Sequence, residues 1–410
     1  MKHVNTIIIG AGQSGLAMSA QLITRGIDHV ILERGQIANS WRSERWDSLY
    51  LLSPNWMNGL AGKAYDGPNC DGFMHVSELV FRFDQTAAAM SAPIQTETTV
   101  LSVNTSPTGY VVQTDQGAMT CTNVVMANGA CARSNVPGFA TNLPQTMHQF
   151  TPQNYKRPDD LPDGKVLVIG ASASGQQLAR EIQASGRQTT LAVGTHLRFP
   201  RTYRGKDIMM WLDVIGATSV SHTEVDDIAR VRRTPSLTLV ADDTIDLNTL
   251  QNEGVEITGR LAAVQDGTAL FSGSLSNLCE VADLKMNRLL TSVDEWIEDN
   301  GLGTLVPASE RFEATRVPTA PKLKLDLARE GFKAVLWATG YEPDFHWLNL
   351  PVFDRKGRLI HDGGVVSDGL YAMGLPYMRQ RQSTFLNGAQ SDAAALAAHL
   401  GARIGQPLAA

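Results

Sequence analysis

The stretch that decides the fold is TIIIGAGQSGLA, which occupies residues 6–17. It is a β-branched apolar run that ends in a glycine-rich turn and continues as an Ala/Leu-rich segment. This order is typical of a strand buried on both faces of a parallel sheet and followed by a helix. A second apolar run, residues 30–32, ends in Glu33. Strand, turn, helix and terminal acid within about 30 residues predict a dinucleotide-binding unit.

Each glycine of this turn has a physical role. Gly10 permits the tight turn, Gly12 lets the backbone approach a pyrophosphate, and Gly15 allows close contact between helix and sheet. The helix N-terminus offers unpaired N–H groups to the phosphates. Glu33 is placed to accept hydrogen bonds from both ribose hydroxyls of an unphosphorylated adenosine. The alternative, a glycine turn that serves packing alone, is disfavoured because strand, helix and acid occur together.

The same pattern returns at VLVIGASASG, residues 166–175. Two such units in one chain usually divide the two cofactors, so we expect FAD at the first unit and a nicotinamide dinucleotide at the second. Its loop residues Gly170, Ser172, Ser174 and Gly175 are expected to surround the second pyrophosphate. Ser172 replaces the middle glycine and adds a hydroxyl donor.

The residues after the second unit bear on the choice of coenzyme. No acid ends the strand expected at residues 189–193, which favours NADPH over NADH. Arg198, Arg201 and Arg204 follow, and a guanidinium suits bidentate recognition of a 2′-phosphate. The alternative is that these arginines form a solvated surface or pair with Asp207 and nearby acids.

The two units predict an α/β fold of two Rossmann-like dinucleotide-binding domains of the three-layer ββα type. We expect the NAD(P) domain to be inserted into the FAD domain. The predicted parts are residues 1–156 and 316–410 for the FAD domain and residues 157–315 for the NAD(P) domain. Helices are expected at residues 73–91, 274–301 and 391–402, and short strands at 94–125.

Composition disfavours several other classes of protein. The 410 residues include 35 basic and 41 acidic ones without a long run of one sign, so neither nucleic acid nor a membrane is expected as partner. The four cysteines form no CxxC pair, which argues against a zinc site and a redox dithiol, and no metal is expected. We expect no signal sequence, and no apolar run of about 20 residues is present. We expect a cytoplasmic protein that acts on a small molecule, and a homodimer is compatible with the sequence.

Further motifs resemble those of the class B flavoprotein monooxygenases, the group that includes the flavin-containing monooxygenases, the plant YUCCA-type enzymes and the Baeyer–Villiger monooxygenases. Besides the two loops, the motifs are LER at 32–34, NSWR at 39–42, RWDSL at 45–49, SPNW at 53–56 and WATGY at 337–341. VMANG at 125–129 is similar to a first copy of the last motif, with Asn in place of Thr. The resemblance covers most of the chain.

The resemblance implies a monooxygenase that uses FAD, NAD(P)H and O2 to insert one oxygen atom into a small amine, sulfide or electron-rich heteroaromatic such as indole, through a C4a-(hydro)peroxyflavin. It implies that Ser53 and Asn55 are catalytic and that residues 52–56 line the flavin. It also implies that the helix opening at 385–388 points its N-terminus at the flavin. The implied cofactor-binding residues outside the glycines and acid already named are Gln13, Ser14, Arg34, Ser40, Trp41, Arg42, Trp46, Leu52, Thr339, Gly340, Gly374, Phe385 and Asn387.

Departures from the family pattern leave alternatives open. His148 precedes Tyr155 by seven residues, so the monooxygenase fingerprint is degraded. Thr195 and His196 stand where relatives that prefer NADPH commonly carry arginine, so NADH is an open alternative. Baeyer–Villiger oxidation of ketones, a flavin or quinone reductase, and a nucleotide-sensing protein without turnover also stay open. For Trp211 and Trp347 we expect core packing.

Overall fold

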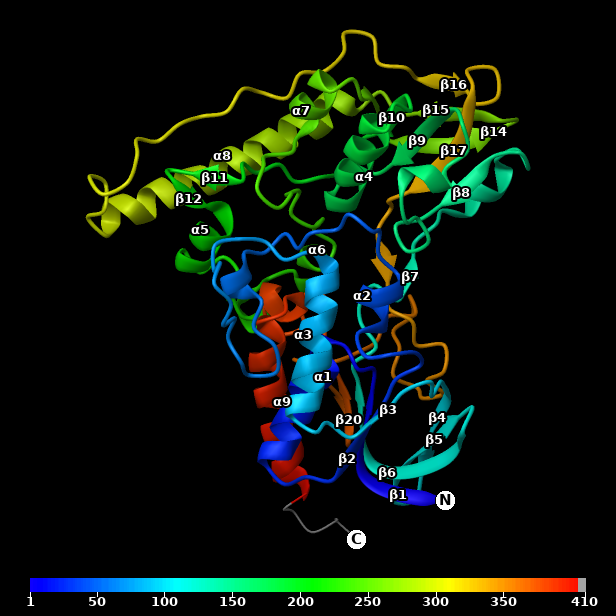
Figure 1. Cartoon of the computed structure of the whole chain (residues 1–410), viewed down its shortest axis with the longest axis vertical. Coiled ribbons are helices and arrows are strands. Elements are labelled where there is room, and N and C mark those ends of the chain that lie inside the picture. The colour runs from blue at the N-terminus through cyan, green and yellow to red at the C-terminus, as the bar shows by residue number, and fades with distance from the viewer. Residues whose placement is uncertain (405–410) are drawn as a thin grey trace.

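The computed structural model describes residues 1–404, which form two domains stacked end to end (Figure 1). The lower domain in Figure 1 contains both the first strand and the last helix, and the middle of the chain forms the upper one. The second domain is therefore inserted into the first, as the sequence predicts.

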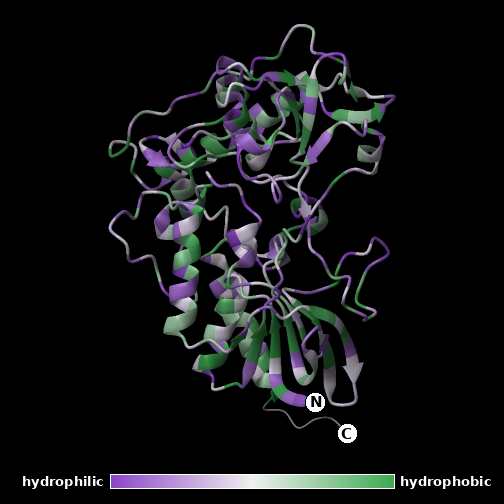
Figure 2. Cartoon of the chain, turned by 45° about the vertical axis from the view of Figure 1, so that its right-hand side comes forward, coloured by the Kyte–Doolittle hydropathy of each residue, from purple (hydrophilic) through white to green (hydrophobic). Residues whose placement is uncertain are grey.

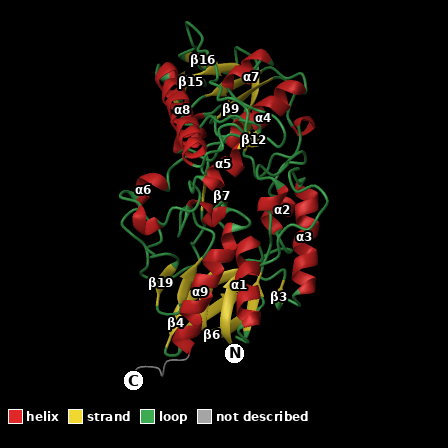
Figure 3. Cartoon of the chain, turned by 90° about the vertical axis from the view of Figure 1, so that its left-hand side faces the viewer, coloured by secondary structure: helices red, strands yellow, loops and turns green. Residues whose placement is uncertain are grey.

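The first domain is built on a mostly parallel sheet with the strand order β19-β20-β6-β1-β2-β3. β1 lies between β2 and β6 and is parallel to both, so its Ile7 and Ile8 are fully buried. Helices cover one face, and the antiparallel pair β4-β5 continues from β6 (Figures 1 and 3). The strands of this sheet are predominantly hydrophobic (Figure 2). Its elements are β1 (Lys2–Ile9), β2 (His29–Leu32), β3 (Ile94–Gln95), β4 (Val100–Ser106), β5 (Gly109–Thr114), β6 (Gly117–Met126), β19 (Val365–Ser367), β20 (Leu370–Ala372), α1 (Gln13–Thr24), α3 (Val76–Ala89) and α9 (Gly388–Ile404).

The second domain has an all-parallel sheet with the order β13-β10-β9-β17-β8. Val166 and Val168 of β9 pack with α4, whereas Leu167 and Ile169 pack with a three-stranded antiparallel sheet. This alternation places the central sheet between a helical layer and a second sheet, which confirms the three-layer ββα type. The elements are β8 (His148–Phe150), β9 (Lys165–Ile169), β10 (Thr189–Ala192), β13 (Glu256–Thr258), β17 (Phe332–Trp337), the antiparallel β14 (Leu261–Gln265), β15 (Thr268–Phe271) and β16 (Lys324–Asp326), and α4 (Ala173–Ala184), α7 (Leu247–Asn252) and α8 (Leu275–Asp299).

The predicted domain boundaries at 157 and 315 are wrong, because the second sheet takes strands from outside that range. β8 lies before residue 157 and β17 after residue 315, yet both pair within this sheet. The two chain crossings between the domains instead meet at β7 (Arg133–Ser134) and β18 (Tyr341–Glu342), which pair as an antiparallel ribbon. Arg133 also pairs with Glu342 at 2.9 Å.

Between β10 and α7, an inserted segment lies at the junction of the two domains (Figure 1). It packs on α8 and on residues 52–57 of the first domain. Trp211 of this segment is 2% exposed, and Trp347 of the first domain is 7% exposed, so the core packing predicted for both is confirmed. The segment contains β11 (Thr202–Tyr203), β12 (Lys206–Asp207), α5 (Ile208–Val214), η4 (His222–Glu224) and α6 (Ile228–Val231).

The helices predicted at residues 73–91 and 274–301 are confirmed as α3 and α8, and the C-terminal helix begins three residues earlier than predicted, at Gly388. Within residues 1–404, no helix has the length and apolar character that a bilayer crossing requires. The remaining short elements are α2 (Asn39–Ser43), η1 (Asn55–Met57), η2 (Gly138–Asn142), η3 (Pro158–Asp160) and η5 (Arg381–Thr384).

Candidate functional site

The first glycine-rich loop has the geometry of a phosphate-binding turn. Gly10 has φ +107°, and a Cβ there would lie 2.6 Å from the Ala127 carbonyl oxygen at the end of β6. A Cβ on Gly15 would lie 1.9 Å from the Gly10 carbonyl oxygen, so the start of α1 sits directly on the turn. At Gly12, by contrast, a Cβ would meet nothing within 4 Å. The loop is therefore closed on its protein side and open at Gly12, as a pyrophosphate requires.

Glu33 lies where β2 ends, beside this loop, and is 7% exposed. Its Oε2 accepts a hydrogen bond from the Ala11 amide at 2.8 Å, and its Oε1 accepts one from the Gly35 amide at 3.1 Å. A carboxylate has about four lone-pair positions, so two further acceptor positions are left for ribose hydroxyls.

The N-terminal ends of α1 and α9 meet at the same place. Gln13 Nε2 donates to the Thr384 carbonyl oxygen at 2.8 Å, and a Cβ on Gly374 would lie 2.6 Å from the Ser14 hydroxyl oxygen. In residues 1–404, buried Oδ1 of Asn387 and Nε2 of Gln390 have no hydrogen-bond partner. Two helix N-termini and unsatisfied polar atoms fit an anionic cofactor that needs both donors and acceptors. The residues present thus fit FAD.

Asp392 lies in the second turn of α9 and is 2% exposed. The nearest cation is Arg379, whose Nε is 4.0 Å from Asp392 Oδ1, and Oδ2 has no partner within residues 1–404. Burial raises the pKa of Asp392 to about 6, although hydrogen bonding to Ser383 and the charges of Arg379 and His222 oppose the shift. This carboxyl is the least compensated acid beside the first site.

Two solvent-exposed ion pairs hold the segment after β2, and the predicted cofactor contacts of Arg34, Ser40, Trp41 and Arg42 stay predictions. Arg34 pairs with Glu44, and Arg42 pairs with Asp84 at 2.8 Å. The Arg45 guanidinium lies 5.2 Å from the Trp41 ring centroid. The Ser40 carbonyl oxygen accepts a hydrogen bond from the Glu44 amide.

The structure contradicts the prediction that Trp46 contacts the cofactor. Trp46 is 5% exposed and packs with Val166 and Leu178 in the core of the second domain. The tryptophan therefore joins the two domains, because the chain from 45 to 49 leaves the first domain and lies against the second.

The loop predicted to be catalytic is largely satisfied by its own hydrogen bonds. Ser53 Oγ donates to Asn58 Oδ1 at 2.6 Å, and Asn58 Nδ2 donates back to the Ser53 carbonyl oxygen at 3.1 Å. Asn55 is 4% exposed and donates from Nδ2 to the Asn69 carbonyl oxygen at 2.9 Å, while its Oδ1 has no partner in residues 1–404. The Ser53 side chain thus stabilises the loop through Asn58. The catalytic roles of Ser53 and Asn55 stay predictions.

An apolar junction lies where the two domains meet. It consists of side chains from the loop at 52–57, from the start of α9 and from the inserted segment, which pack in one cluster: Leu52, Trp56, Met57, Met210, Ile215 and Phe385. The Leu52 carbonyl oxygen accepts from Arg201 Nη1 at 2.8 Å, so the two domains are joined at this point by a hydrogen bond as well. Side chains from both domains therefore form one apolar lining, in which Met57 is buried and the other five are partly exposed.

The second glycine-rich loop repeats the geometry of the first. Gly170 again has φ +107°, and a Cβ there would lie 2.3 Å from the Ala338 carbonyl oxygen, at the end of β17. A Cβ on Gly175 would lie 1.8 Å from the Gly170 carbonyl oxygen. The two similar motifs at 125–129 and 337–341 thus have one physical role, since each ends the strand against which a first glycine packs. Gly340 is open, and Thr339 Oγ1 donates to the Asn135 carbonyl oxygen.

The side chains of the second loop are engaged within the protein. Ser172 Oγ donates to the Ser236 carbonyl oxygen at 3.1 Å and lies 3.0 Å from Ser236 Oγ. Ser174 hydrogen-bonds Tyr341, whose pKa is raised chiefly by burial. The hydroxyl predicted to bind the pyrophosphate therefore binds Ser236 in this structure, and the backbone of the loop is left for a ligand.

The structure also contradicts the prediction that Arg198, Arg201 and Arg204 bind a 2′-phosphate. They are 6%, 3% and 6% exposed, and each has an acidic partner. The pairs are Arg198 with Asp246 and Asp283 at 2.7 Å each, Arg201 with Asp207 at 2.5 Å, and Arg204 with Asp294 at 3.1 Å. A buried guanidinium already paired with a carboxylate is not available to a phosphate. The pairing with Asp207 and nearby acids, given above as the alternative, is what the structure shows.

The sequence reasoning missed a strap, residues 228–240, that comprises α6 and the chain after it. Its Ser236 contacts Ser172, and its Leu239 carbonyl oxygen accepts from Gln177 Nε2 of α4 at 2.6 Å. On the other side, Arg232 Nε donates to the Tyr377 carbonyl oxygen of the first domain at 3.4 Å. The strap thus crosses from one domain to the second loop, and α6 lies beside the gap between the domains in Figure 3. The signal in the sequence is the basic run from Arg230 to Arg233.

Cys121 and Cys279 are the two cysteines buried in the cores of the domains. All four cysteines are unbridged, and burial raises the pKa of Cys121 and of Cys279 to about 12, which keeps both as unreactive thiols. Cys70 is exposed, and burial raises the pKa of Cys131 as well. Within residues 1–404, no three His, Cys, Asp or Glu side chains are grouped as metal ligands.

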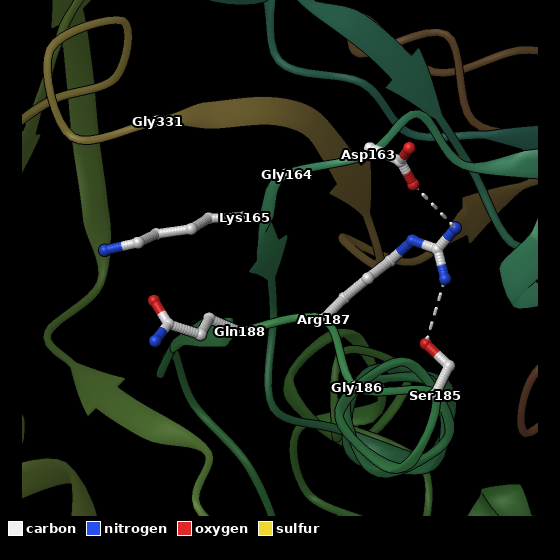
Figure 4. Close-up of a pocket in the computed structure, with 8 residues that line it drawn as sticks. All are labelled: Asp163, Gly164, Lys165, Ser185, Gly186, Arg187, Gln188 and Gly331. Carbon is white, nitrogen blue, oxygen red and sulfur yellow. Dashed lines mark hydrogen bonds and ion pairs between the residues drawn. The ribbon is translucent and has the colours of Figure 1, made fainter.

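A surface hollow of about 410 Å³ lies at the N-terminal ends of β9 and β10. Figure 4 shows Arg187 between Asp163, at 3.9 Å, and Ser185, at 3.2 Å. Ligands of open α/β sheets bind beyond the carboxyl ends of the strands, whereas this hollow is at the opposite edge. It is therefore separate from the candidate site.

Comparison with known proteins agrees with the two-nucleotide geometry. The sequence pattern of the pyridine nucleotide-disulphide oxidoreductase family matches residues 7–215. An uncharacterized CzcO-like oxidoreductase of Geobacillus kaustophilus is 28% identical over 96% of this chain and 97% of its own. The probable indole-3-pyruvate monooxygenase YUCCA4 of Arabidopsis thaliana is 29% identical over 43% of each chain. A flavin-containing monooxygenase from Stenotrophomonas maltophilia has a similar structure, with a TM-score of 0.69 at 17% identity over 99% of this chain and 100% of its own.

Two glycine-rich loops of matching geometry, one in each of two interlocked domains, define a flavoprotein fold with two dinucleotide sites. The chain belongs to the pyridine nucleotide-disulphide oxidoreductase family. Its relatives and structural neighbours, which include indole-3-pyruvate and flavin-containing monooxygenases, agree with the resemblance to the class B flavoprotein monooxygenases, and the family match makes it an oxidoreductase.

Proposed function

We propose that the protein is an FAD-dependent, NAD(P)H-consuming monooxygenase that inserts one oxygen atom of O2 into a small organic amine, sulfide or electron-rich heteroaromatic molecule. The observation that carries the proposal is the apolar junction, which side chains from both domains build next to the start of α9. When bound, FAD supplies hydride acceptance from the nicotinamide and activation of O2.

The residues of the chain bind, orient and protect rather than react. The open backbone at Gly12 and the N-termini of α1 and α9 hold the cofactor phosphates and polar ring atoms, and Glu33 holds the ribose. Once cofactor and substrate cover its partly exposed side chains, the apolar junction excludes water from the reacting centre, which favours oxygen transfer over loss of peroxide. Asn55 is our candidate for accepting a hydrogen bond from the reacting flavin edge, since its buried Oδ1 has no partner in residues 1–404.

For the coenzyme, we propose that NADPH and NADH both serve. The arginines that favoured NADPH are engaged in buried ion pairs, so the argument for selective 2′-phosphate binding is gone. Neither Thr195 nor His196, at the end of β10, carries a fixed negative charge that would repel a 2′-phosphate. We expect catalytic efficiencies with the two coenzymes to lie within about tenfold, or about 1.4 kcal/mol in transition-state stabilisation.

The test compares the amount of coenzyme oxidised with the amounts of oxygenated product and hydrogen peroxide formed. Purified FAD-loaded protein is mixed with NADPH or NADH, O2 and a panel containing a tertiary amine, a thioether and indole, and coenzyme oxidation, product and hydrogen peroxide are measured together. Oxygenated product that matches NAD(P)H consumption for at least one compound supports the proposal. Peroxide equal to coenzyme consumed with every compound, or reduction of quinones without oxygenated product, identifies a reductase and refutes it.

A further inference from the structure

The strap, residues 228–240, carries an unusual concentration of unpaired positive charge. Arg230, Arg232 and Arg233 fall within four residues, and none takes part in the ion pairs formed among residues 1–404. Many other arginines of the second domain, such as Arg180, Arg187 and Arg198, do have acidic partners. The strap therefore holds, within four residues of chain, three arginines without an ion-pair partner in residues 1–404.

Arg232 is the most unusual of the three because it is half-buried. Its contact is with a neutral carbonyl oxygen, that of Tyr377, and its pKa is lowered by burial and by the charge of Arg358. Burial lowers the pKa of His361 to about 4, and the charges of Arg232 and His222 contribute, while Asp362, which pairs with His222, opposes the shift. A half-buried cation without an acidic partner of its own is costly unless an anion comes to it.

The strap runs from Arg232, which contacts Tyr377 of the first domain, to Ser236, which contacts the second glycine-rich loop. Ser236 touches Ser172, the residue that occupies the pyrophosphate-facing position of that loop. Arg233 is three residues before Ser236, and three residues of chain span at most about 11 Å. Since Arg233 is exposed and its side chain is long and flexible, its guanidinium can reach an anion on the loop.

We propose that Arg232 and Arg233 bind the pyrophosphate of the nicotinamide dinucleotide, with the strap as the cover of the second site. The inference rests on the proposed function only in taking NAD(P) as the ligand of that site. The pyrophosphate is chosen over the 2′-phosphate because Ser236 is fixed to the glycine-rich loop, whereas a 2′-phosphate belongs beyond the end of β10. The strap then supplies the cations that the buried Arg198, Arg201 and Arg204 do not.

The experiment measures binding without turnover. FAD-loaded wild type, Arg232→Gln and Arg233→Gln are titrated with NADP⁺, NAD⁺ and ADP-ribose by calorimetry at low and high salt. Each substitution is expected to weaken all three ligands by about tenfold, the value of one charge-assisted hydrogen bond. The salt dependence of binding should fall as well, because a charge contact is lost. Arg233→Lys should retain part of the affinity.

The control is Arg288→Gln, which changes an exposed arginine of α8 that forms no ion pair within residues 1–404. It should bind all three ligands as the wild type does, and FAD content should be equal in all variants. Unchanged affinity in both strap variants overturns the inference, as does wild-type protein that binds none of the ligands. A loss confined to NADP⁺ assigns the arginines to the 2′-phosphate and overturns the pyrophosphate assignment. Because no oxygen transfer is measured, failure of the monooxygenase proposal would leave these binding results standing.

Discussion

Replacing Asp392 by asparagine should stabilise the protein at neutral pH. The carboxyl is 2% exposed, and burial raises its pKa from the ordinary value of 3.8 to about 6. One pKa unit corresponds to about 1.4 kcal/mol, so ionised Asp392 destabilises the folded state by about 3 kcal/mol. Asparagine has the same shape without the charge. We therefore expect Asp392→Asn to raise the free energy of unfolding by up to about 3 kcal/mol at pH 7.5.

The sign of the pH dependence follows from linkage. The folded pKa lies above the unfolded one, so the folded state binds more protons between about pH 4 and pH 6, and wild-type stability falls as pH rises through this window. The gain from Asp392→Asn should therefore shrink towards zero near pH 4. Urea unfolding followed by tryptophan fluorescence at pH 4.5 and 7.5 measures both values.

Asp354 provides a control of opposite sign. It is partly exposed, and hydrogen bonds from Arg358 and Lys356 lower its pKa to about 2. Asp354→Asn should therefore lose stability at both pH 4.5 and pH 7.5, and the loss should fade only as pH falls from about 4 to about 2. If Asp392→Asn is less stable than wild type at pH 7.5, or if its gain is the same at both pH values, the burial argument is refuted.

Three further substitutions test the loops and the domain junction. Gly15→Ala places a Cβ 1.9 Å from the Gly10 carbonyl oxygen, so we expect protein that purifies without FAD or does not fold, as flavin absorbance and circular dichroism will show; normal flavin content would contradict this packing. Gly12→Ala meets open space, so folding should persist while FAD affinity, measured by titration of apoprotein, drops by about tenfold; wild-type affinity would count against a pyrophosphate at Gly12. Arg201→Met leaves Asp207 and the Leu52 carbonyl without their partner, so the free energy of unfolding should fall by about 3 kcal/mol, whereas Lys206→Met on the exposed side should change it little; equal effects would contradict the assigned role.

The parts of the fold and site that follow from short stretches of chain could be predicted from sequence. Gly10, Gly15 and Glu33 act within one strand-turn-helix-strand unit, so their spacing alone specifies their geometry. The domain insertion follows because the pattern occurs twice. The predicted domain boundaries were wrong because β8 is very short and β17 is far from β9 in the chain. No pattern in their own sequences indicates that both strands pair in the second sheet.

The arginines show why the rest was out of reach. Arg198 meets Asp246 and Asp283, which are 48 and 85 residues away, and Arg204 meets Asp294, 90 residues away. A cation that will be neutralised by a distant acid looks in sequence like one that waits for a ligand. The arginines of the strap form no ion pair within residues 1–404, and their sequence did not show that either, because it does not reveal which distant acids fold against them. Burial and pairing, rather than residue type, separate the two groups.

The ribbon of β7 and β18 carries both chain crossings between the domains as one hydrogen-bonded unit. A single crossing would let the domains swivel in any direction, but a two-stranded ribbon bends more easily across its face than within its plane. Its strands also begin just beyond Ala127 and Ala338, the residues whose carbonyl oxygens face Gly10 and Gly170. Any reorientation of one domain against the other therefore has to bend this ribbon, which follows in the chain from the floor of both nucleotide loops.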